Sequence, residues 1–596
     1  MASTTASSPP TDIAKRMAVS KNAADDMMRV LSIYDTGVLP VSPPAGGEAA
    51  YGSDEEEAFA AAEDVILRRN SSSSSSGMND YLYAVDDAIA AAALQGGLAS
   101  RAAEAVQAAM PRLEEEARAL LSSSSSSSAR RHSFSYSDDL VVDDATSPPD
   151  ASSPSSRLSP RAAASVLGVA DRMLRAGYGP ELAQVYVAVR RDALAEAVAH
   201  LTGAADPVAI EEVLRMDWPA LDQKMRRWNH AVRAVVRTVL AGERQLCDEV
   251  FASDEELGHE CFADVARGCV LQLLGFADAV AMSARATEKL FRTIGMHEAL
   301  ADVAPELVAL FAGDARDLFD AEVSAVSARL GCTVRRTIEE FGAVIQGESS
   351  RRPVLAGEIH PMTRYVLNYC GLLADCRGTL DIVLVDTIDS FDGGEADNHD
   401  GAAATSTPSG RCMRELMTRL LRKMDEKSCL YDDAGLKHIF LMNNLYYIVQ
   451  KVMDSPVREL LGDDWIRRHR GQIRQYETGY LRASWIAVLS CLRDDGSAAG
   501  PTVKDKARSF NAAFEELYRN QTSWKVIDPQ LREELRIAVS ERLIPAYRSF
   551  LARPRTQTGS SSGSSRHSAS RYIKYSLEDL EDYMLDFFEG VQKFVK

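Results

Sequence analysis

The sequence predicts an all-α protein whose N-terminal region is partly disordered. From about residue 159 onward, apolar residues recur at intervals of three and four, and almost no segment alternates as a strand does. No fixed repeat of about 34 or 40 residues is visible, which argues against a regular solenoid. Because 596 residues with 46% hydrophobic content are too many for one compact core, we expect several packed units.

The first 157 residues are rich in serine and carry an acidic run, Asp54–Glu57. Six consecutive serines stand at Ser71–Ser76 and seven more at Ser122–Ser128. Such tracts cannot bury enough apolar surface to offset the entropy of ordering the chain, so we expect flexible linkers there. Three islands between them have helical patterns: Ala14–Tyr34, Ala58–Arg69 and Asn79–Leu121.

One serine in this region is a candidate for phosphorylation. Arg130 and Arg131 stand just before Ser133, an arrangement that a basophilic kinase could recognise. The alternative is a plain linker with no regulatory role.

In the body of the chain, the segment from Ile439 to Met453 predicts a helix that is buried on two sides. A helix that is apolar along two neighbouring stripes belongs inside a bundle. The first stripe consists of Ile439, Met442, Tyr446, Val449 and Met453, and the second of Leu441, Leu445, Ile448 and Val452.

Two further helices are expected near the C-terminus. Asp528 and Pro529 form an N-cap and a first helical position, and Pro545 should kink the helix that follows. Ser576 and Asp579 have the spacing of a capping box at the start of the last helix. The apolar stripe of the first helix is Leu531, Leu535, Val539, Leu543, Ala546 and Phe550, and that of the second is Leu580, Tyr583, Met584, Phe587, Phe588 and Val591.

Two loops are expected to interrupt these helices. Asp392–Gly410 is acidic and rich in small residues, and Thr556–Ser570 is a Gly/Ser insertion. A helical framework tolerates such surface loops at small entropic cost. Asp381–Val385 is too short, and too compatible with a helix, to predict a strand.

The nine cysteines include no CxxC pair, and most lie in apolar helical stretches. We therefore expect buried, reduced thiols in a cytosolic protein, with disulfides or metal ligation as the alternatives. No apolar run approaches the roughly 18 to 20 residues that span a bilayer, and Met1–Pro10 has no signal-peptide core. Any membrane contact should then be peripheral.

The sequence carries no recognisable catalytic motif. A phosphate-binding loop, a dinucleotide-binding glycine motif and a nucleophile elbow are all missing, which disfavours enzymes of these classes. His259 and His297 each precede a glutamate as in a zinc protease helix, but alanine stands where the second histidine would be. His360 is expected to be a structural residue at a helix start, and Asp463 and Asp464 to be helix-terminal charges. We expect no enzyme, cofactor or metal site.

The charge distribution singles out the C-terminal end. Between Lys504 and Tyr575 there are 14 Lys and Arg against 7 Asp and Glu, in a chain whose net charge is −19. A basic end on an acidic protein usually faces a polyanion, and nucleic acid, an acidic protein and an anionic membrane are the candidates.

Several long strings in this sequence resemble the seventy-kilodalton subunit of the exocyst vesicle-tethering complex, in its expanded land-plant form. The similarity covers about residues 160 to 592, and several long motifs in the right order are far more specific than one short pattern. The strings are Glu358–Tyr369, Ile439–Gln450, Ser509–Phe514 and Tyr572–Tyr575, together with Met216–Trp218, Leu461–Trp465 and Asp528–Arg532.

The resemblance implies an elongated rod of consecutive antiparallel helical bundles that tethers secretory vesicles to the plasma membrane and binds phosphoinositides through its C-terminal end. In the family, two basic residues flank the Tyr-Ile of the terminal motif, and here these are Arg571 and Lys574. Arginine stands where the family often has lysine, which keeps the charge and adds a fork suited to phosphate. Lys504, Lys506 and Arg508 form a second basic cluster, for which a solvated helix face is the alternative.

The resemblance also implies partners and domains. The expected partners are the other exocyst subunits and an anionic phosphoinositide membrane, not nucleic acid, with a cytoplasmic location peripheral to the plasma membrane. The alternative is a specialised interaction protein in plant defence, engaged by pathogen effectors or immune receptors and no longer assembled into the exocyst, because serine tracts break the N-terminal region through which family members join the complex. The expected domains are a flexible region (1–157), N-terminal bundles (158–350) and C-terminal bundles with the basic membrane-facing end (351–596).

Overall fold

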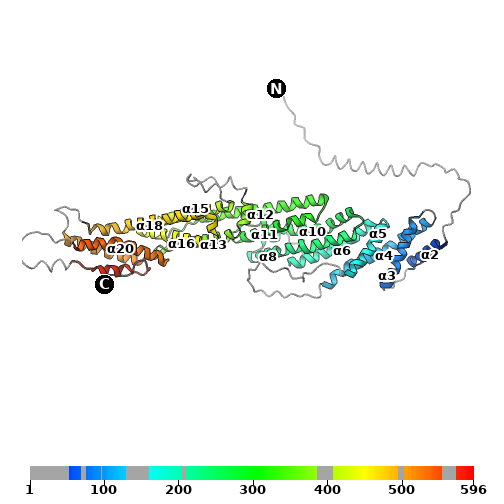
Figure 1. Cartoon of the computed structure of the whole chain (residues 1–596), viewed down its shortest axis with the longest axis horizontal. Coiled ribbons are helices and arrows are strands. Elements are labelled where there is room, and N and C mark those ends of the chain that lie inside the picture. The colour runs from blue at the N-terminus through cyan, green and yellow to red at the C-terminus, as the bar shows by residue number, and fades with distance from the viewer. Residues whose placement is uncertain are drawn as a thin grey trace, which may run out of the picture. The chain divides into compact units, whose positions relative to one another are not determined.

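The computed structural model describes residues 53–68, 75–94, 97–128, 160–203, 210–385, 407–493, 502–552 and 572–595. Helices make up nearly all of the regular structure in these ranges (Figure 1). Over the same ranges the β-type pairing consists of one isolated antiparallel bridge, between Lys525 and Glu589. The prediction of an all-α fold is confirmed.

The chain divides into two compact units, Met1–Ala108 and Ala109–Lys596. Unit 1 contains α2 (Ser53–Leu67), α3 (Ser75–Ala92) and the beginning of α4 (Gly97–Ser128). Its buried side chains include Phe59, Tyr81 and Val85, where α2 packs against α3.

The helical islands of this region differ in two respects from the sequence-based expectation. Asn79–Leu121 is two helices, α3 and α4, separated next to the Gly96-Gly97 pair, which disfavours a helix interior. The expectation of a linker at Ser122–Ser128 is wrong, because α4 continues to Ser128. Extending an existing helix adds one backbone hydrogen bond per residue without a new nucleation step. The island at Ala14–Tyr34 lies outside the described residues.

In unit 2 the first group of helices packs mainly in four pairs: α6 on α10, α10 on α12, α11 on α12, and α8 on α11. The helices of this group are α5 (Pro160–Arg175), α6 (Gly179–Thr202), α7 (Ile210–Arg215), α8 (Trp218–Ala234), the π-helical turn η1 (Val235–Leu240), α9 (Ala241–Val250), α10 (Glu255–Met282), the 3₁₀ turn η2 (Thr287–Lys289), α11 (Leu290–Ala309) and α12 (Gly313–Gly347).

An ion pair lies in the core of this group. Arg190 and Glu243 are each 1% exposed, and Arg190 Nη2 lies 2.6 Å from Glu243 Oε2. The Tyr186 hydroxyl donates a hydrogen bond to Glu243 Oε1 at 2.8 Å, which satisfies the carboxylate further. Burial, together with the nearby Glu243 carboxylate, raises the pKa of Tyr186, so its hydroxyl keeps the proton that it donates.

Helix α10 differs from the expectation that no apolar run is long enough to span a bilayer. Among the described helices, it alone has the length and mean hydropathy that could span a bilayer. Phe262, Val265 and Val270 are nevertheless fully buried against other helices of unit 2, as in the core helix of a bundle.

The second group of helices shares one hydrophobic core with the end of the first. This core joins Val334 and Phe341 of α12 to Val366 of the following helix, so it continues across the boundary expected at residue 350. The helices of this group are η3 (Leu355–Gly357), α13 (Pro361–Asp375), α14 (Arg377–Val383), α15 (Pro408–Ser428), α16 (Ala434–Met453), α17 (Val457–Leu461) and α18 (Asp463–Ser490).

Helix α16 is buried on both predicted stripes. All residues of the two stripes are buried except Tyr446 and Met453, which are half-buried. One stripe faces the core shared with α12 and α13, and Ile439 and Met442 on the other stripe face a second core that reaches the C-terminus. The prediction of a bundle helix is confirmed.

The polar residues singled out at helix starts have the structural roles expected of them. His360 Nδ1 accepts a hydrogen bond from the Met362 amide at 3.1 Å and so caps α13. Asp463 and Asp464 lie in the first turn of α18. Asp528 Oδ1 accepts hydrogen bonds from the amides of Gln530 at 2.9 Å and Leu531 at 3.0 Å.

The last group comprises α19 (Val503–Thr522), α20 (Pro529–Ala552) and α22 (Leu577–Met584). Ser576 and Asp579 form the predicted capping box of α22. The helix ends earlier than its apolar pattern suggests, because Phe588 and Gly590 adopt φ angles of 67° and 80°. Val591 is therefore 59% exposed, and its predicted burial is wrong. Pro545 lies inside α20, which continues to Ala552.

All nine cysteines are free thiols. Cys247, Cys261, Cys269, Cys370 and Cys412 are buried, whereas Cys429 is exposed. Burial raises the pKa of Cys370, which keeps that thiol protonated and unreactive.

Candidate functional site

The C-terminal segment 572–595 runs along α19 in the same direction as the helix. Near the start of α19, Asn511 Nδ2 donates to the Tyr572 carbonyl at 3.2 Å. Further along, Tyr518 is bound to Asp586, and at the end the Lys593 amide donates to Thr522 Oγ1 at 3.0 Å. The segment that carries the terminal motif is thereby fixed on one helix.

At the start of α19, two exposed cations flank one aromatic ring. Lys504 Nζ lies 4.5 Å and Arg508 Cζ 5.0 Å from the centroid of the Tyr572 ring. Residues four apart share a helix face, so α19 presents both cations to the same ring. Cation–π contacts of this kind orient the two side chains while leaving their charge available to an anion.

Two turns after Arg508, an acidic residue of α19 meets the terminal motif. Lys574 Nζ donates to Glu515 Oε1 at 2.8 Å, and the Tyr575 hydroxyl donates to the same oxygen at 2.9 Å. The side chain of Lys574 is 44% exposed and that of Glu515 38% exposed. The hydrogen bond from Lys574, aided by that from Tyr575, holds the pKa of Glu515 below its usual value. Glu515 therefore offsets part of the positive charge of Lys574 at neutral pH.

The remaining predicted site residues lie apart from this group or outside the described ranges. Lys506 is 9% exposed, and its Nζ donates to the Arg493 carbonyl at 2.8 Å. Residues two apart point to opposite sides of a helix, so the neighbours Lys504 and Arg508 face solvent while Lys506 faces the protein. Arg571 and Ser133 lie outside the described residues.

Sequence reasoning missed Glu515 and the role of Asn511. Both belong to a polar stripe of α19 with helical spacing: Lys504, Arg508, Asn511, Glu515, Tyr518 and Thr522. Each of these side chains contacts segment 572–595. The spacing was visible in the sequence, but nothing in it indicated which segment the stripe meets.

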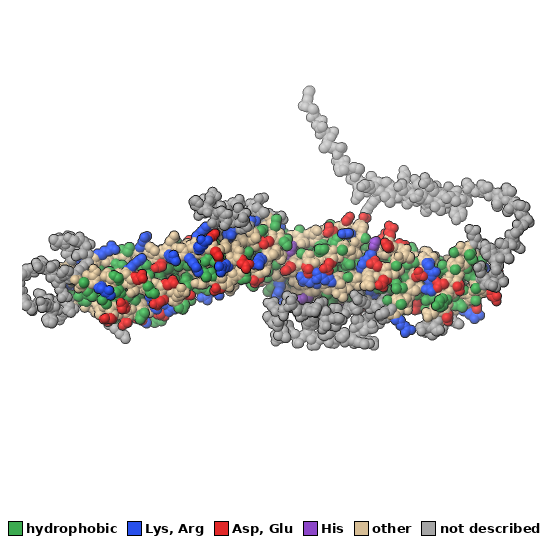
Figure 2. Space-filling model, viewed as in Figure 1, with side chains coloured by type: hydrophobic (Ala, Val, Ile, Leu, Met, Phe, Trp, Pro, Cys, Tyr) green, Lys and Arg blue, Asp and Glu red, His purple; other side chains and the backbone are tan. Residues whose placement is uncertain are grey.

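This arrangement can bind a multivalent anion. Lys504, Arg508 and Lys574 offer ammonium and guanidinium groups around one segment, and phosphate groups accept charge-assisted hydrogen bonds from both kinds of donor. The face drawn in Figure 2 also shows further Lys and Arg side chains gathered over the stretch from α15 to α20, interspersed with acidic ones.

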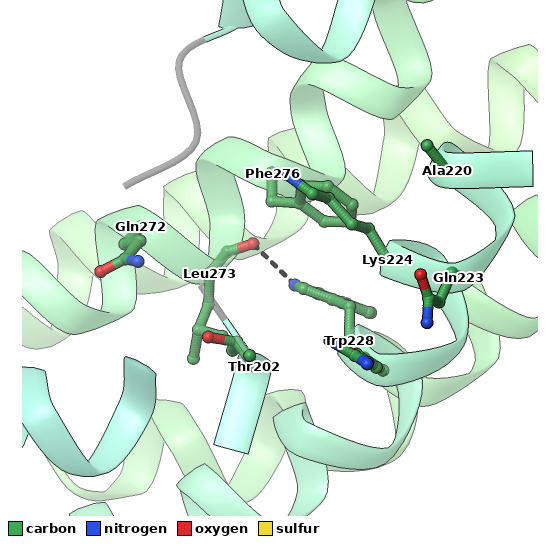
Figure 3. A pocket seen from close by; sticks show the side chains of 10 residues that line it. Thr202, Ala220, Gln223, Lys224, Trp228, Gln272, Leu273 and Phe276 are labelled. Carbon is green, nitrogen blue, oxygen red and sulfur yellow. Dashed lines mark hydrogen bonds between the residues drawn. The ribbon is translucent and has the colours of Figure 1, made fainter. Parts of the chain in front are cut away.

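A separate cavity of about 140 Å³ lies between the end of α6, α8 and α10. Trp228 Nε1 donates to the Leu273 carbonyl at 3.0 Å, which fixes the indole ring in the wall of this cavity (Figure 3). Lys224 is itself paired with Glu212 at 3.2 Å. The residues that line this cavity include no carboxylate, histidine or cysteine, so they supply no acid–base pair.

Metal binding finds no support in the described ranges, where no group of three or more His, Cys, Asp and Glu side chains is arranged to hold a metal ion.

Comparison with protein families gives two matches. Residues 226–586 match the family of C-terminal regions of the Exo70 protein of the exocyst complex, and residues 58–123 match the family of N-terminal regions of the exocyst complex component Exo70. Together they include most of the described helices.

Individual proteins show the same relationship. The chain is 35% identical over 439 residues to Exocyst complex component EXO70A1 of Arabidopsis thaliana, a match that covers 71% of this chain and 66% of that protein. It is also 35% identical over 427 residues to EXO70B1 of the same plant, again covering 71% and 66%. The chain thus matches just under two thirds of the length of these relatives.

Among solved structures, Exo70 of S. cerevisiae superposes with a TM-score of 0.58 at 14% sequence identity, covering 91% of this chain and all of that one. A second structure of the yeast protein gives a TM-score of 0.55. At this identity the comparison establishes the fold.

Proposed function

Because the chain belongs to the Exo70 family of exocyst subunits, we propose that it acts as a tether in exocytosis, holding secretory vesicles at the plasma membrane. It works as a cytoplasmic scaffold and not as a catalyst, with the other exocyst subunits as partners. It contacts the membrane peripherally, by binding phosphoinositides through the C-terminal end.

The observation that carries the membrane proposal is the set of cations around segment 572–575. Lys504 and Arg508 stack on Tyr572, and the side chain of Lys574, two residues later in the terminal motif, is 44% exposed. Arg571 immediately precedes Tyr572 in the sequence, and its role rests on the resemblance of the motif. A cluster of this kind suits the several phosphates of a phosphoinositide headgroup better than a single monovalent anion.

The expected strength of this contact is modest. Each Lys or Arg near an anionic leaflet contributes about 1 kcal/mol, and the attraction fades beyond a Debye length of roughly 8 Å at physiological salt. Binding should therefore be additive in the number of cations and should weaken as salt is raised.

The test is co-sedimentation of the full chain with liposomes that contain phosphoinositides, at low and physiological salt. Replacing Arg571 and Lys574 together with alanine should remove about 2 kcal/mol, roughly thirtyfold in affinity. The double variant Lys504→Ala/Arg508→Ala should lose a similar amount. Arg316→Ala/Arg336→Ala, at two exposed positions of α12, is the matched control and should bind like the parent.

Circular dichroism must show that all variants are folded. Equal binding by both test variants and the parent would remove these residues from the contact, and a folded parent that binds no anionic liposome would contradict the membrane proposal. Membership of the complex is tested separately, by identifying the exocyst subunits that co-purify from native tissue. A folded chain that recovers none of them would favour the specialised interaction protein instead.

A further inference from the structure

A second surface of unit 2 is built around a projecting leucine. Leu355 is 87% exposed, the highest value for a large apolar side chain among the described residues. It begins the short 3₁₀ helix η3 between α12 and α13, far in sequence from the basic end. A single exposed leucine is ordinary, so the way it is held matters more than the exposure itself.

The loop that carries Leu355 is strained and firmly anchored. Ala356 has a φ of 57°, in the left-handed region that residues with a Cβ rarely adopt, and Gly357 follows with a φ of 74°. The Lys525 amide donates to the Ala356 carbonyl at 2.9 Å, and Asn443 Nδ2 donates to the Gly357 carbonyl at 2.7 Å.

The loop is also held from a third side, because the Tyr431 hydroxyl donates to the Val354 carbonyl at 2.7 Å. Backbone strain that is held by surrounding contacts tends to occur at functional sites. The fold thus keeps Leu355 in the solvent on a rigid support.

Beside this loop lies a cleft of about 290 Å³. Ile359, four residues after Leu355, forms part of its wall, and Asn443, which anchors the loop, forms another part. The cleft is mainly apolar and aromatic, although Gln450 and Asp528 belong to its wall; the other residues that line it are Tyr446, Tyr447, Ile527, Pro529 and Leu531. A cavity of this size and character accepts an apolar side chain.

The rim of the cleft is positively charged. Arg364 Cζ and Lys451 Nζ lie 5.9 Å and 6.0 Å from the ring centroid of Tyr447, which lines the cleft. Both cations are exposed, as are Arg351 and Arg352 just before Leu355. None of these four side chains forms a salt bridge within the described ranges.

Two acidic residues belong to this surface, Glu358 after the loop and Asp528 in the wall of the cleft, and both have partners. Glu358 lies 2.7 Å from Lys525 Nζ, and the Asp528 carboxylate caps α20 through two backbone amides. The surface therefore combines an apolar cleft, a projecting leucine and an excess of positive charge. A ligand that matches this surface would carry negative charge for the rim and an apolar group for the cleft.

We propose that Leu355 and the adjacent cleft form a docking surface for an acidic protein segment with an apolar anchor residue. The anchor occupies the cleft against Tyr446 and Tyr447, the acidic residues that flank it meet Arg364 and Lys451, and Leu355 packs on its apolar side. Proteins recognise short segments in this way when a rigid groove receives one buried side chain and charges fix the register.

This surface is separate from the proposed lipid contact. Lys504 lies in the first turn of α19, whereas Lys525, which binds the Leu355 loop, follows the end of that helix. A 20-residue helix is about 30 Å long, so the two surfaces lie at opposite ends of α19. Failure of lipid binding would not affect this proposal, and the reverse also holds.

The test uses the full chain and fluorescein-labelled 12-residue peptides. Each peptide carries one central Leu, Phe or Trp flanked by Asp and Glu, and matched peptides carry Asn and Gln in place of the acids or Ala in place of the anchor. Fluorescence polarisation at physiological salt should show that at least one acidic anchored peptide binds about tenfold more tightly than both of its matched peptides.

Two variants of the surface should weaken that binding. Leu355→Ser removes the projecting apolar side chain, and Arg364→Glu/Lys451→Glu reverses the rim charge; each should lower the affinity by about tenfold. The matched controls are Ile382→Ser, at a 69% exposed position on α14, and Lys504→Glu/Arg508→Glu at the start of α19. Both controls should bind the peptide like the parent.

Three results would overturn the proposal. The first is no preference for acidic anchored peptides over the matched ones. The second is loss of binding in the Lys504→Glu/Arg508→Glu control while the Leu355 and rim variants bind normally, which would assign the peptide to the C-terminal end. The third is loss of binding to phosphoinositide liposomes by Leu355→Ser with unchanged peptide binding, which would make a membrane the occupant of this surface.

Discussion

The ammonium group of Lys574 donates a hydrogen bond to the carboxylate of Glu515 across 2.8 Å. Lys574 belongs to the terminal motif and Glu515 to α19, so the pair joins two segments 59 residues apart. An anion that approaches Lys574 meets a neighbouring carboxylate at the same time. The pair therefore offsets part of the positive charge of Lys574 in the free protein.

Removing the charge of Glu515 should strengthen binding to anionic membranes. Glu515→Gln keeps an acceptor for Lys574 and Tyr575 but removes one negative charge from the proposed contact, which is worth about 1 kcal/mol or roughly fivefold in affinity. Liposome co-sedimentation at physiological salt measures the change. Glu516→Gln, at the exposed neighbouring position, removes the same net charge and should have a smaller effect. An equal gain in both variants would show that only net charge matters.

A charge on the buried face of α16 should unfold the second group of helices. Val449 is 2% exposed, so Val449→Asp places an unpaired carboxylate in an apolar core and should cost several kcal/mol. Loss of soluble expression, or a large fall in melting temperature, is the expected result. Lys451→Asp on the exposed face of the same helix is the control and should express normally. Unchanged melting of Val449→Asp would mean that this helix is not packed as described.

Breaking the buried ion pair in the first group should be more harmful than replacing it. Glu243→Gln leaves the Arg190 guanidinium without its counter-ion in a site that is 1% exposed, which should cost about 3 to 5 kcal/mol. The double variant Arg190→Met/Glu243→Leu removes both charges and should lose less stability than Glu243→Gln. Urea denaturation of the parent, Glu243→Gln and the double variant measures the three free energies of unfolding. A double variant that is less stable than Glu243→Gln would contradict this account.

Stability should fall as His360 becomes protonated. Burial lowers the pKa of His360. The neutral ring is the form that caps α13, because its Nδ1 accepts a hydrogen bond from the Met362 amide. In the unfolded chain a histidine titrates near about pH 6.5, so the stabilisation is present above that pH and is lost as the pH falls through the lower pKa of the folded state.

The variant His360→Asn keeps a side chain that can cap the helix but cannot titrate. The loss of unfolding free energy between pH 7.5 and pH 5.5 should be smaller in this variant than in the parent. His230→Asn, at an exposed histidine, is the control and should follow the parent. The same pH dependence in all three proteins would exclude His360 as a source of the acid sensitivity.

Much of the local structure was predictable because its causes are local. The two apolar stripes of α16, the cap at Asp528 and the capping box at Ser576 follow from residues within a few positions of one another. A prediction failed where the apolar pattern of a helix continued but contacts with a distant segment ended the helix. Val591 continues the apolar pattern of α22, but the chain turns at Phe588 to pair with Lys525 and Trp524, so Val591 is exposed.

In the candidate site, too, some features followed from the local sequence and others depended on distant contacts. Charge counting indicated the basic end, and the spacing of α19 was visible, but three neighbouring cations have three different environments. Lys504 stacks on Tyr572, Lys506 is bound to a backbone carbonyl, and Lys574 is paired with Glu515. The outcome for each ammonium group depends on a partner that is 13 to 68 residues away in sequence.

The sequence by itself determined that the chain is helical, where several of its C-terminal helices begin, and that the C-terminal end is basic. Backbone preference, capping and net charge are properties of residues close together in the chain. Only the tertiary structure decided which cations are exposed, that Glu515 offsets Lys574, and that Leu355 projects beside an apolar cleft. These features arise where α16, α19 and the C-terminal segment pack together. The spacing of apolar residues shows that one face of a helix is buried. Which other helix packs on that face depends on how all the helices pack together.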